Sequence, residues 1–235
     1  MSKLQELIQR LCPDGVEYKK LGEVCEYVRG VTYSKSQECK LSSEKGIKIL
    51  RANNITLFSN TLNFEDVKMI KPDTRIKDSQ WLKADDILIC AGSGSKEHVG
   101  KVAYINTSID YAFGGFMAVL RVKDRLMSRF LFFVLTSSYF ADYLKMALNS
   151  TTINNLNGSI MNAFKVPVPP LEVQEEIVKI LDRFAVYAAE LQAELQARKE
   201  QYEYYRNLLL TFNPAGCAGE ADDEQEGSVT TWGGA

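Results

Sequence analysis

The sequence predicts an α/β protein, in which a globular domain with a twisted mixed β-sheet and small helices is followed by a long C-terminal coiled-coil helix. Three patterns support this fold class. Short segments rich in β-branched and aromatic residues alternate with turn residues from Gly30 to about residue 122. Helical spacing of apolar residues occurs before and after this region. A heptad pattern then runs through residues 171–212. We therefore expect a domain over 1–170, a helix over 171–212 and an acidic, disordered tail over 213–235.

The N-terminal segment is expected to form a short helix. Leu4, Leu7, Ile8 and Leu11 recur at helical spacing, and Cys12-Pro-Asp-Gly15 supplies the turn residues that would end it. Charged residues occur throughout this segment, so it is not predicted to be a signal peptide. A second short element is expected to begin near Lys20.

Four strands are predicted in the middle of the chain, at Ile47–Arg51, Asp86–Cys90, Lys101–Ile105 and Phe116–Val122. Turn residues punctuate these strands, and they include Asn53-Asn54, Gly92-Ser-Gly-Ser95 and Gly114-Gly115.

Ser128–Leu148 has the apolar spacing of one or two amphipathic helices. A polar stretch of small residues follows at 149–159, and Lys165–Pro170 is expected to be extended because a residue before proline disfavours the α region.

The segment from Leu171 to Phe212 contains neither proline nor glycine and has one apolar seam. Arg198 is its single charged member. A 3.5-residue period sustained over five heptads predicts a coiled coil, which needs a partner to bury its stripe. The other seam positions are Ile177, Leu181, Phe184, Ala188, Leu191, Leu195, Tyr202, Tyr205, Leu209 and Phe212.

The net charge of −2 hides a segregation of charge along the chain. Residues 1–170 contain 23 basic and 17 acidic side chains, a balance of +6. Residues 171–212 contain 5 basic and 8 acidic side chains, and residues 213–235 contain five acids and no base. The near-neutral total therefore does not exclude a nucleic-acid partner, because the domain itself is mildly basic.

The composition limits the compartment in which the protein works and the kinds of metal or cofactor site that it can form. The five cysteines are scattered, with no CxxC pair, which indicates reduced thiols in a cytoplasmic protein. The longest apolar run has six residues, so no membrane span is predicted. His98 is the only histidine, and no cofactor or metal site is expected.

The motifs of common enzymes are missing. Gly94–Lys101 departs from the P-loop spacing, and a strand-like segment follows it instead of a helix. Glu38-Cys-Lys40 has the spelling of a nuclease motif but lies in a polar loop without an acidic partner. The only Pro-Pro pair, in Val168-Pro-Pro-Leu171, lacks the flanking residues of an amino-methylating enzyme. The sequence therefore predicts a binding protein with no catalytic residue.

Three loops carry the side-chain types that contact bases and phosphates, namely amides, hydroxyls and long cations. Each loop taken alone is also compatible with a solvated loop whose side chains bond to nearby backbone. The candidates are Arg51, Asn53 and Asn54 in the first loop; Ser93, Ser95, Lys96, His98 and Lys101 in the second; and Asn149, Ser150, Thr151, Thr152, Asn154 and Asn155 in the third.

Several segments, in this order, resemble the DNA-specificity (S) subunit of type I restriction-modification systems. They are Gly30-Val-Thr-Tyr33, Gly46–Ile55, Leu82–Ser95 with Gly100–Ala103, and Ser150–Phe184, of which the last is the most specific. The resemblance covers about residues 15–212.

The resemblance implies a non-catalytic, sequence-specific subunit that binds double-stranded DNA and targets methylating (M) and restriction (R) subunits. Such subunits normally carry two target-recognition domains, each recognising one half of a split site, separated by two long helices that dock the methylating subunits. This chain has one recognition domain and one helix, which predicts that a second copy or second half-subunit pairs through the coiled coil. The rival hypotheses are a coiled-coil adaptor unrelated to DNA and a fused restriction or methylation enzyme.

Overall fold

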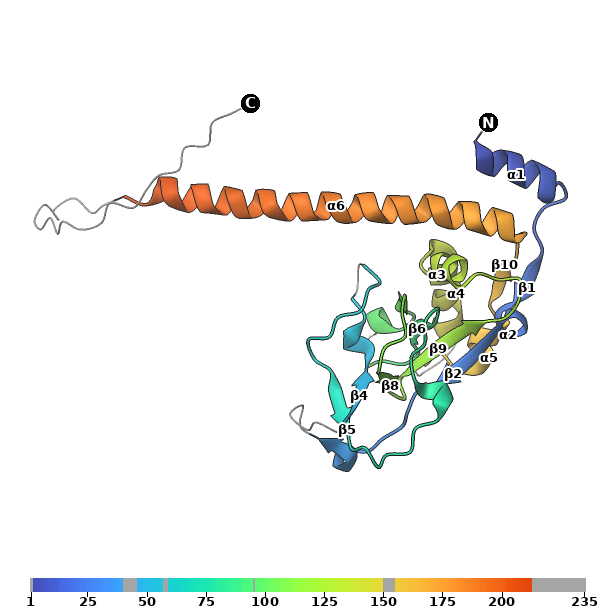
Figure 1. The fold of residues 1–235 in the computed structure, drawn as a ribbon, viewed down its shortest axis with the longest axis horizontal. Coiled ribbons are helices and arrows are strands. Elements are labelled where there is room, and N and C mark those ends of the chain that lie inside the picture. The colour runs from blue at the N-terminus through green and yellow to red at the C-terminus, as the bar shows by residue number, and fades with distance from the viewer. Residues whose placement is uncertain (1, 40–45, 57–58, 95, 150–154, 213–235) are drawn as a thin grey trace, which may run out of the picture. The chain divides into compact units, whose positions relative to one another are not determined.

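The computed structural model describes residues 2–39, 46–56, 59–94, 96–149 and 155–212 (Figure 1). The chain divides into two compact units, Met1–Phe184 and Ala185–Ala235. The first turns of the long helix thus belong to the first unit, whereas the sequence placed the boundary near residue 170.

A four-stranded antiparallel sheet forms the centre of the first unit. Its strands lie in the order β2 (Cys25–Arg29), β9 (Met117–Val122), β6 (Ile87–Cys90) and β7 (Val102–Tyr104). Every residue of β6 is buried, as expected for an apolar run covered on both faces.

A second four-stranded sheet is mixed. Its order is β3 (Glu38–Cys39), β5 (Lys68–Ile70), β4 (Ile47–Leu50) and β8 (Ala112–Phe113), in which only β4 and β8 are parallel. The α/β class is confirmed, but the strands lie in three sheets, of which these two have four strands each, where the sequence predicted one.

The chain crosses between the two sheets at Gly30, directly after β2. A Cβ atom at Gly30 would lie 2.2 Å from the carbonyl oxygen of Gly114, so a larger residue would push the two chain segments apart. The amide N–H of Val31 donates to the Phe113 carbonyl over 2.7 Å, which ties the crossing to the end of β8. This close approach explains why a glycine is required at the start of the Gly30–Tyr33 segment.

Residues near the two ends of the first unit pair in a small ribbon. β1 (Tyr18–Lys20) lies antiparallel to β10 (Lys165–Pro167), so the proline-rich segment is extended, as predicted. α1 (Lys3–Leu11) packs near the start of α6 (Leu171–Leu210), where Leu7 and Val173 share a small apolar cluster.

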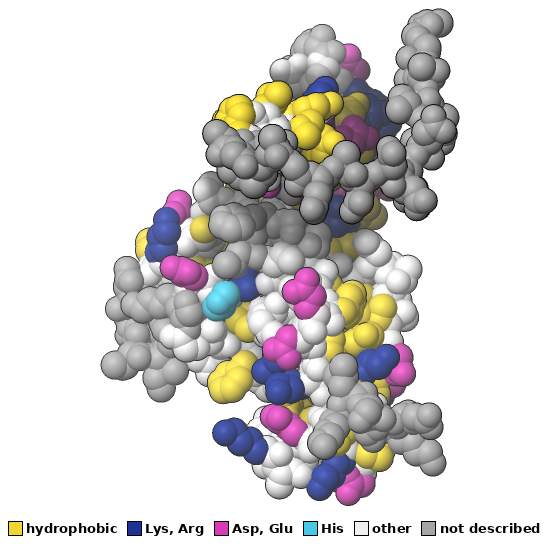
Figure 2. Space-filling view, turned by 90° about the vertical axis from the view of Figure 1, so that its left-hand side faces the viewer, with side chains coloured by type: hydrophobic (Ala, Val, Ile, Leu, Met, Phe, Trp, Pro, Cys, Tyr) yellow, Lys and Arg dark blue, Asp and Glu magenta, His cyan; other side chains and the backbone are white. Residues whose placement is uncertain are grey.

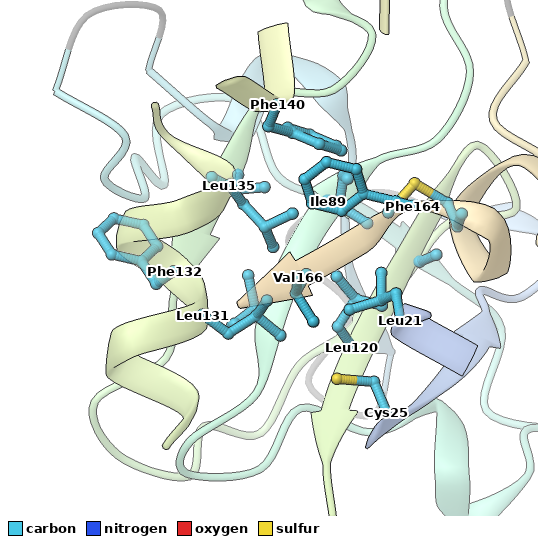
Figure 3. Packing of buried hydrophobic residues seen from close by; sticks show 14 of the residues in the cluster. Leu21, Cys25, Ile89, Leu120, Leu131, Phe132, Leu135, Phe140, Phe164 and Val166 are labelled. Atoms are coloured by element: carbon cyan, nitrogen blue, oxygen red, sulfur yellow. The ribbon is translucent and has the colours of Figure 1, made fainter. Parts of the chain in front are cut away.

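Helices cover one face of the central sheet. α3 (Ser128–Leu135) and α4 (Ser138–Asn149) pack with the short helices α2 (Leu21–Val24) and α5 (Gly158–Ala163) in one apolar cluster. Figure 3 shows Leu131 and Leu135 of α3 near Val166, and Phe140 of α4 against Phe164. The rings of Phe140 and Phe164 meet edge to face with centroids 4.9 Å apart.

The long helix α6 contains 40 residues and is about 60 Å long at 1.5 Å per residue. The predicted helix is confirmed, and it ends two residues earlier than expected. Its first turn is anchored by Gln174, whose side chain is fully buried. From Arg183 to Phe212 every side chain is exposed.

Within the ranges that the structure describes, no helix is long and apolar enough to cross a bilayer. The same residues contain no group of three or more His, Cys, Asp or Glu side chains placed to hold a metal ion.

Candidate nucleic-acid interface

The described parts of the three predicted loops meet at one end of the two four-stranded sheets. The first follows β4, the second follows β6, and the third precedes α5. The N–H of Gly114, after β8, donates to the Leu50 carbonyl over 2.9 Å, so the ends of the parallel strands β4 and β8 adjoin. Gly92 forms an isolated β-bridge with Asn155, and the Leu156 N–H donates to the Ala91 carbonyl over 2.6 Å. Loops separated by up to 100 residues therefore form one surface.

Lys101 joins the first loop to the second. Its ammonium Nζ donates to the carbonyl oxygens of Ala52 at 3.1 Å and Ile55 at 2.7 Å. Only 9 % of the residue is exposed, and this burial lowers the pKa of its ammonium group. The sequence predicts Lys101 as a DNA contact, but its ammonium group instead holds the loops together, so it is not part of the proposed interface.

Arg29, at the end of β2, joins the third loop to the rest. Its Nη1 donates to Asn155 Oδ1 and to the Leu156 carbonyl, both at 3.2 Å, and its Nη2 donates to the Gly115 carbonyl at 2.8 Å. The sequence analysis missed this residue because it lies within a strand pattern. Its place directly before Gly30 is the only local signal of a special role.

Asn54 also has an internal role. It is fully buried, and its Oδ1 accepts the N–H of Arg51 at 2.8 Å. Its Nδ2 donates to the carbonyl oxygens of Asn63 at 3.1 Å and Asp66 at 3.3 Å. The side-chain amide of Asn54 therefore forms hydrogen bonds with buried backbone groups and is not accessible to a base. Asn54 is likewise not part of the proposed interface.

Arg51 and Asn53 remain at the surface of the first loop. The side chain of Arg51 is 32 % exposed, and Asn53 is exposed. Both donate to the same carboxylate oxygen of Asp66, Arg51 through Nη2 at 2.7 Å and Asn53 through Nδ2 at 2.9 Å.

The second loop presents a short 3₁₀ turn, η4 (Lys96–His98). His98 is partly buried, and its Nδ1 has no hydrogen-bond partner within the described ranges. Ser93 is half-buried. Ser95 and the side chain of Lys96 lie outside the described residues.

Of the third loop, Asn149 is the last residue of α4, and the exposed Asn155 bonds to Arg29. The predicted contacts Ser150, Thr151, Thr152 and Asn154 lie outside the described residues.

Phe116 is a surface residue that the sequence analysis took for the start of a strand. It is 73 % exposed, and its carbonyl oxygen accepts the N–H groups of Ala91 and Gly92 at 2.8 and 2.9 Å. An exposed aromatic ring is thus held on a fixed backbone between the second and third loops. Phenylalanine can make apolar contact with the methyl group of thymine in the major groove.

The face that carries the histidine has mixed charge (Figure 2). Lys and Arg side chains lie beside Asp and Glu side chains on it, without a uniformly basic patch. Among the residues drawn in colour on this face, basic donors are interspersed with acidic groups.

The second unit presents an exposed apolar seam along α6. Leu191 is 66 % exposed and Leu209 is 71 % exposed, and Tyr187 and Leu208 widen the stripe. Exposed apolar surface of this extent is characteristic of an interaction site. Ile177 and Leu181, at the start of the seam, are partly buried within the first unit.

A family model described as the type I restriction modification DNA specificity domain matches residues 13–200. The specificity subunit of the type I restriction enzyme EcoKI from Escherichia coli (strain K12) is 29 % identical over 203 residues, which cover 86 % of this chain and 42 % of that protein. The StySPI specificity subunit from Salmonella potsdam is 27 % identical over 198 residues, covering 84 % of this chain and 42 % of that protein. The chain thus spans less than half the length of these curated relatives.

Solved structures share the fold. The HsdS subunit from Thermoanaerobacter tengcongensis superimposes with a TM-score of 0.54 at 20 % identity, over 81 % of this chain and 44 % of that one. The S subunit of a type I restriction-modification system from M. genitalium gives a TM-score of 0.53 at 15 % identity, over 84 % of this chain and 47 % of that one.

Proposed function

Because this chain belongs to the type I restriction-modification DNA specificity family, we propose that it is the subunit that selects the DNA target for such a complex. The family consists of recognition subunits without catalytic activity of their own. The observation that carries the proposal is the convergence of the three loops, which Lys101 and Arg29 hold together. A fixed surface with amide, guanidinium and aromatic groups suits contact with base edges in a DNA groove.

The proposed target is one half of a split double-stranded DNA site. The accessible candidates for base or phosphate contact are Arg51, Asn53, His98 and Asn155, together with Phe116. The predicted contacts Ser93 and Asn149 also stay in the proposal. So do the predicted contacts outside the described residues, among them Lys96 and Thr151. The partners are the methylating and restriction subunits, which the chain would direct to DNA in the cytoplasm.

The proposed partner of the α6 seam is a second copy of this chain. One observation supports it: the seam is exposed from Phe184 to Phe212. Two copies joined through their helices would carry two recognition domains. Because a symmetric pair presents the same surface twice, its target would be a palindromic split site.

Methylation mapping tests this function. The chain would be co-expressed with its methylating subunit, and methylated positions would be mapped across the host genome. We expect one split motif with two inverted half-sites. An asymmetric motif would refute the symmetric pair while leaving DNA recognition intact.

Direct binding separates the rival functions. Affinity of the purified complex for duplex DNA should fall steeply as salt increases, because bound phosphates release counterions. Lack of binding at low salt, even with the methylating subunit present, would favour the coiled-coil adaptor. DNA cleavage or methyl transfer by the purified chain alone would favour the enzyme.

A further inference from the structure

The side-chain carboxylate of Asp66 occupies two donors of the candidate interface at once. One oxygen, Oδ2, accepts from Arg51 Nη2 at 2.7 Å and from Asn53 Nδ2 at 2.9 Å. Guanidinium and amide donors are the groups that bind phosphate oxygens and base acceptors in DNA. The carboxylate thus occupies two donors of the kind that bind acceptors in DNA.

The backbone that carries Asp66 is held in place. The buried amide of Asn54 donates to the Asp66 and Asn63 carbonyl oxygens, and Asn63 Nδ2 donates back to the Asn53 carbonyl at 2.9 Å. The Asp66 side chain itself is 65 % exposed. An exposed carboxylate on a fixed backbone can exchange its partners without rearrangement of the loop.

One N–H donor of the Arg51 guanidinium lacks a hydrogen-bond acceptor in this arrangement. Its Nε is buried and has no hydrogen-bond acceptor among the residues that the structure describes. A conformation of Arg51 that reaches outward to a DNA acceptor would free this donor from its buried position. The contact with Asp66 is therefore one that DNA can displace.

We propose that Asp66 is a specificity-determining residue, which holds Arg51 and Asn53 in competition with DNA and so suppresses binding to non-target sequences. The proposal rests on the proposed DNA-binding function. A correct site supplies enough contacts to displace the carboxylate. A random sequence supplies mainly phosphates, which the exposed negative charge also repels.

The test measures binding of the full 235-residue chain to a random-sequence duplex across a range of salt concentrations. Asp66→Asn should tighten this binding about three- to fivefold, because exposed ion pairs change equilibria by no more than about fivefold. The slope of log affinity against log salt should steepen by about one, the contribution of one further phosphate contact. Weaker or unchanged binding would overturn the proposal and would indicate a structural role or a direct base contact of Asp66.

Two further variants distinguish the contact between Asp66 and Arg51 from a general effect of negative charge on DNA binding. Glu65→Gln removes the same charge from an exposed neighbour that has no ion-pair partner within the described ranges. Because salt screens the charge of an exposed side chain, this variant should change the affinity for DNA less than about twofold. In an Arg51→Met background, Asp66→Asn should lose most of its effect. An equal gain in that background would refute the competition while leaving DNA binding established. If no variant binds duplex DNA at low salt, the proposed function and this inference both fail.

Discussion

Single residues in the loops divide into those that hold the surface and those that are presented on it. Lys101, Asn54 and Arg29 bond to backbone atoms of neighbouring loops. Asn53 and Phe116 are exposed. The two groups contain similar polar residue types, so their roles follow from burial and partners.

Lys101→Met tests a holding residue. The substitution removes both hydrogen bonds from Nζ and leaves the Ile55 carbonyl buried without a partner. We expect a loss of about 1–3 kcal/mol in the free energy of unfolding, the usual result of an unsatisfied buried polar group. Urea denaturation measures this. The matched control is Lys71→Met at an exposed position, which should change stability by less than about 0.5 kcal/mol. Equal effects of the two would contradict the structural role of Lys101.

At the scale of elements, the helix α6 has two parts: its first turns pack in the first unit, and its remaining turns are exposed. Its first turns pack in the first unit, where Gln174 Oε1 accepts the Met127 N–H at 2.8 Å. Gln174 Nε2 donates to the carbonyl oxygens of Arg125 at 2.9 Å and Pro169 at 2.7 Å. The remaining turns present the exposed seam. The charge of Arg129 completes the anchor through an ion pair with Asp182 at 2.6 Å.

Gln174→Leu should weaken the anchor of α6. Leucine has a similar size but cannot bond to the three backbone groups, of which the Pro169 carbonyl makes a buried contact and the other two make partly buried contacts. We expect a loss of about 1–3 kcal/mol in the free energy of unfolding. The comparison is Glu175→Leu at the exposed neighbouring position, which should be nearly neutral. Chemical denaturation followed by circular dichroism provides the measurement, and a neutral Gln174→Leu would show that the anchor lies elsewhere.

Leu191→Asp should abolish pairing through the seam. The substitution places a charge in the middle of the apolar stripe, where a coiled-coil partner would have to bury it. Sedimentation equilibrium should show a dimer for the parent chain and a monomer for the variant. Ala193→Asp adds the same charge outside the 4–3 pattern and should remain dimeric. A dimeric Leu191→Asp variant would refute the seam as the interface.

For the molecule as a whole, buried thiols predict an alkaline limit of stability. Burial raises the pKa of the Cys25 thiol to about 12 and that of Cys90 to about 11, and charged Lys123 and Lys101 oppose these shifts only partly. The thiols of the unfolded chain ionise near pH 8.5, roughly three and a half pH units below the folded pKa of Cys25. The contribution of the protonated thiols to the free energy of unfolding is therefore complete below about pH 8.5. It is lost as the pH rises toward the pKa values of the folded state.

The expected result is a free energy of unfolding that falls between about pH 9 and pH 11, by about 1.4 kcal/mol per pH unit for each thiol. Urea denaturation under reducing conditions at several pH values measures the slope. Cys25→Ala is expected to lower stability near neutral pH, but it should reduce the slope at alkaline pH by the share of one thiol. Parallel pH profiles for the parent and Cys25→Ala would contradict the assignment.

The sequence by itself determined the features that depend on local pattern. The α/β class, the strands at β4, β6, β7 and β9, and the helix from Leu171 follow from periodicity and from the positions of Gly and Pro. The seam is encoded in the same way, because a heptad pattern lies within one continuous segment.

The tertiary structure decided which polar residues the loops use internally. Lys101 bonds to residues 46 and 49 positions away, and Arg29 bonds to residues 86 to 127 positions away. The division into two four-stranded sheets depends in the same way on the approach of Gly30 to Gly114. Burial and hydrogen-bond pairing between such distant residues are set by the packing of the whole domain. A local pattern could therefore make the loops candidates for binding, but only the fold shows which of their described side chains lie at the surface.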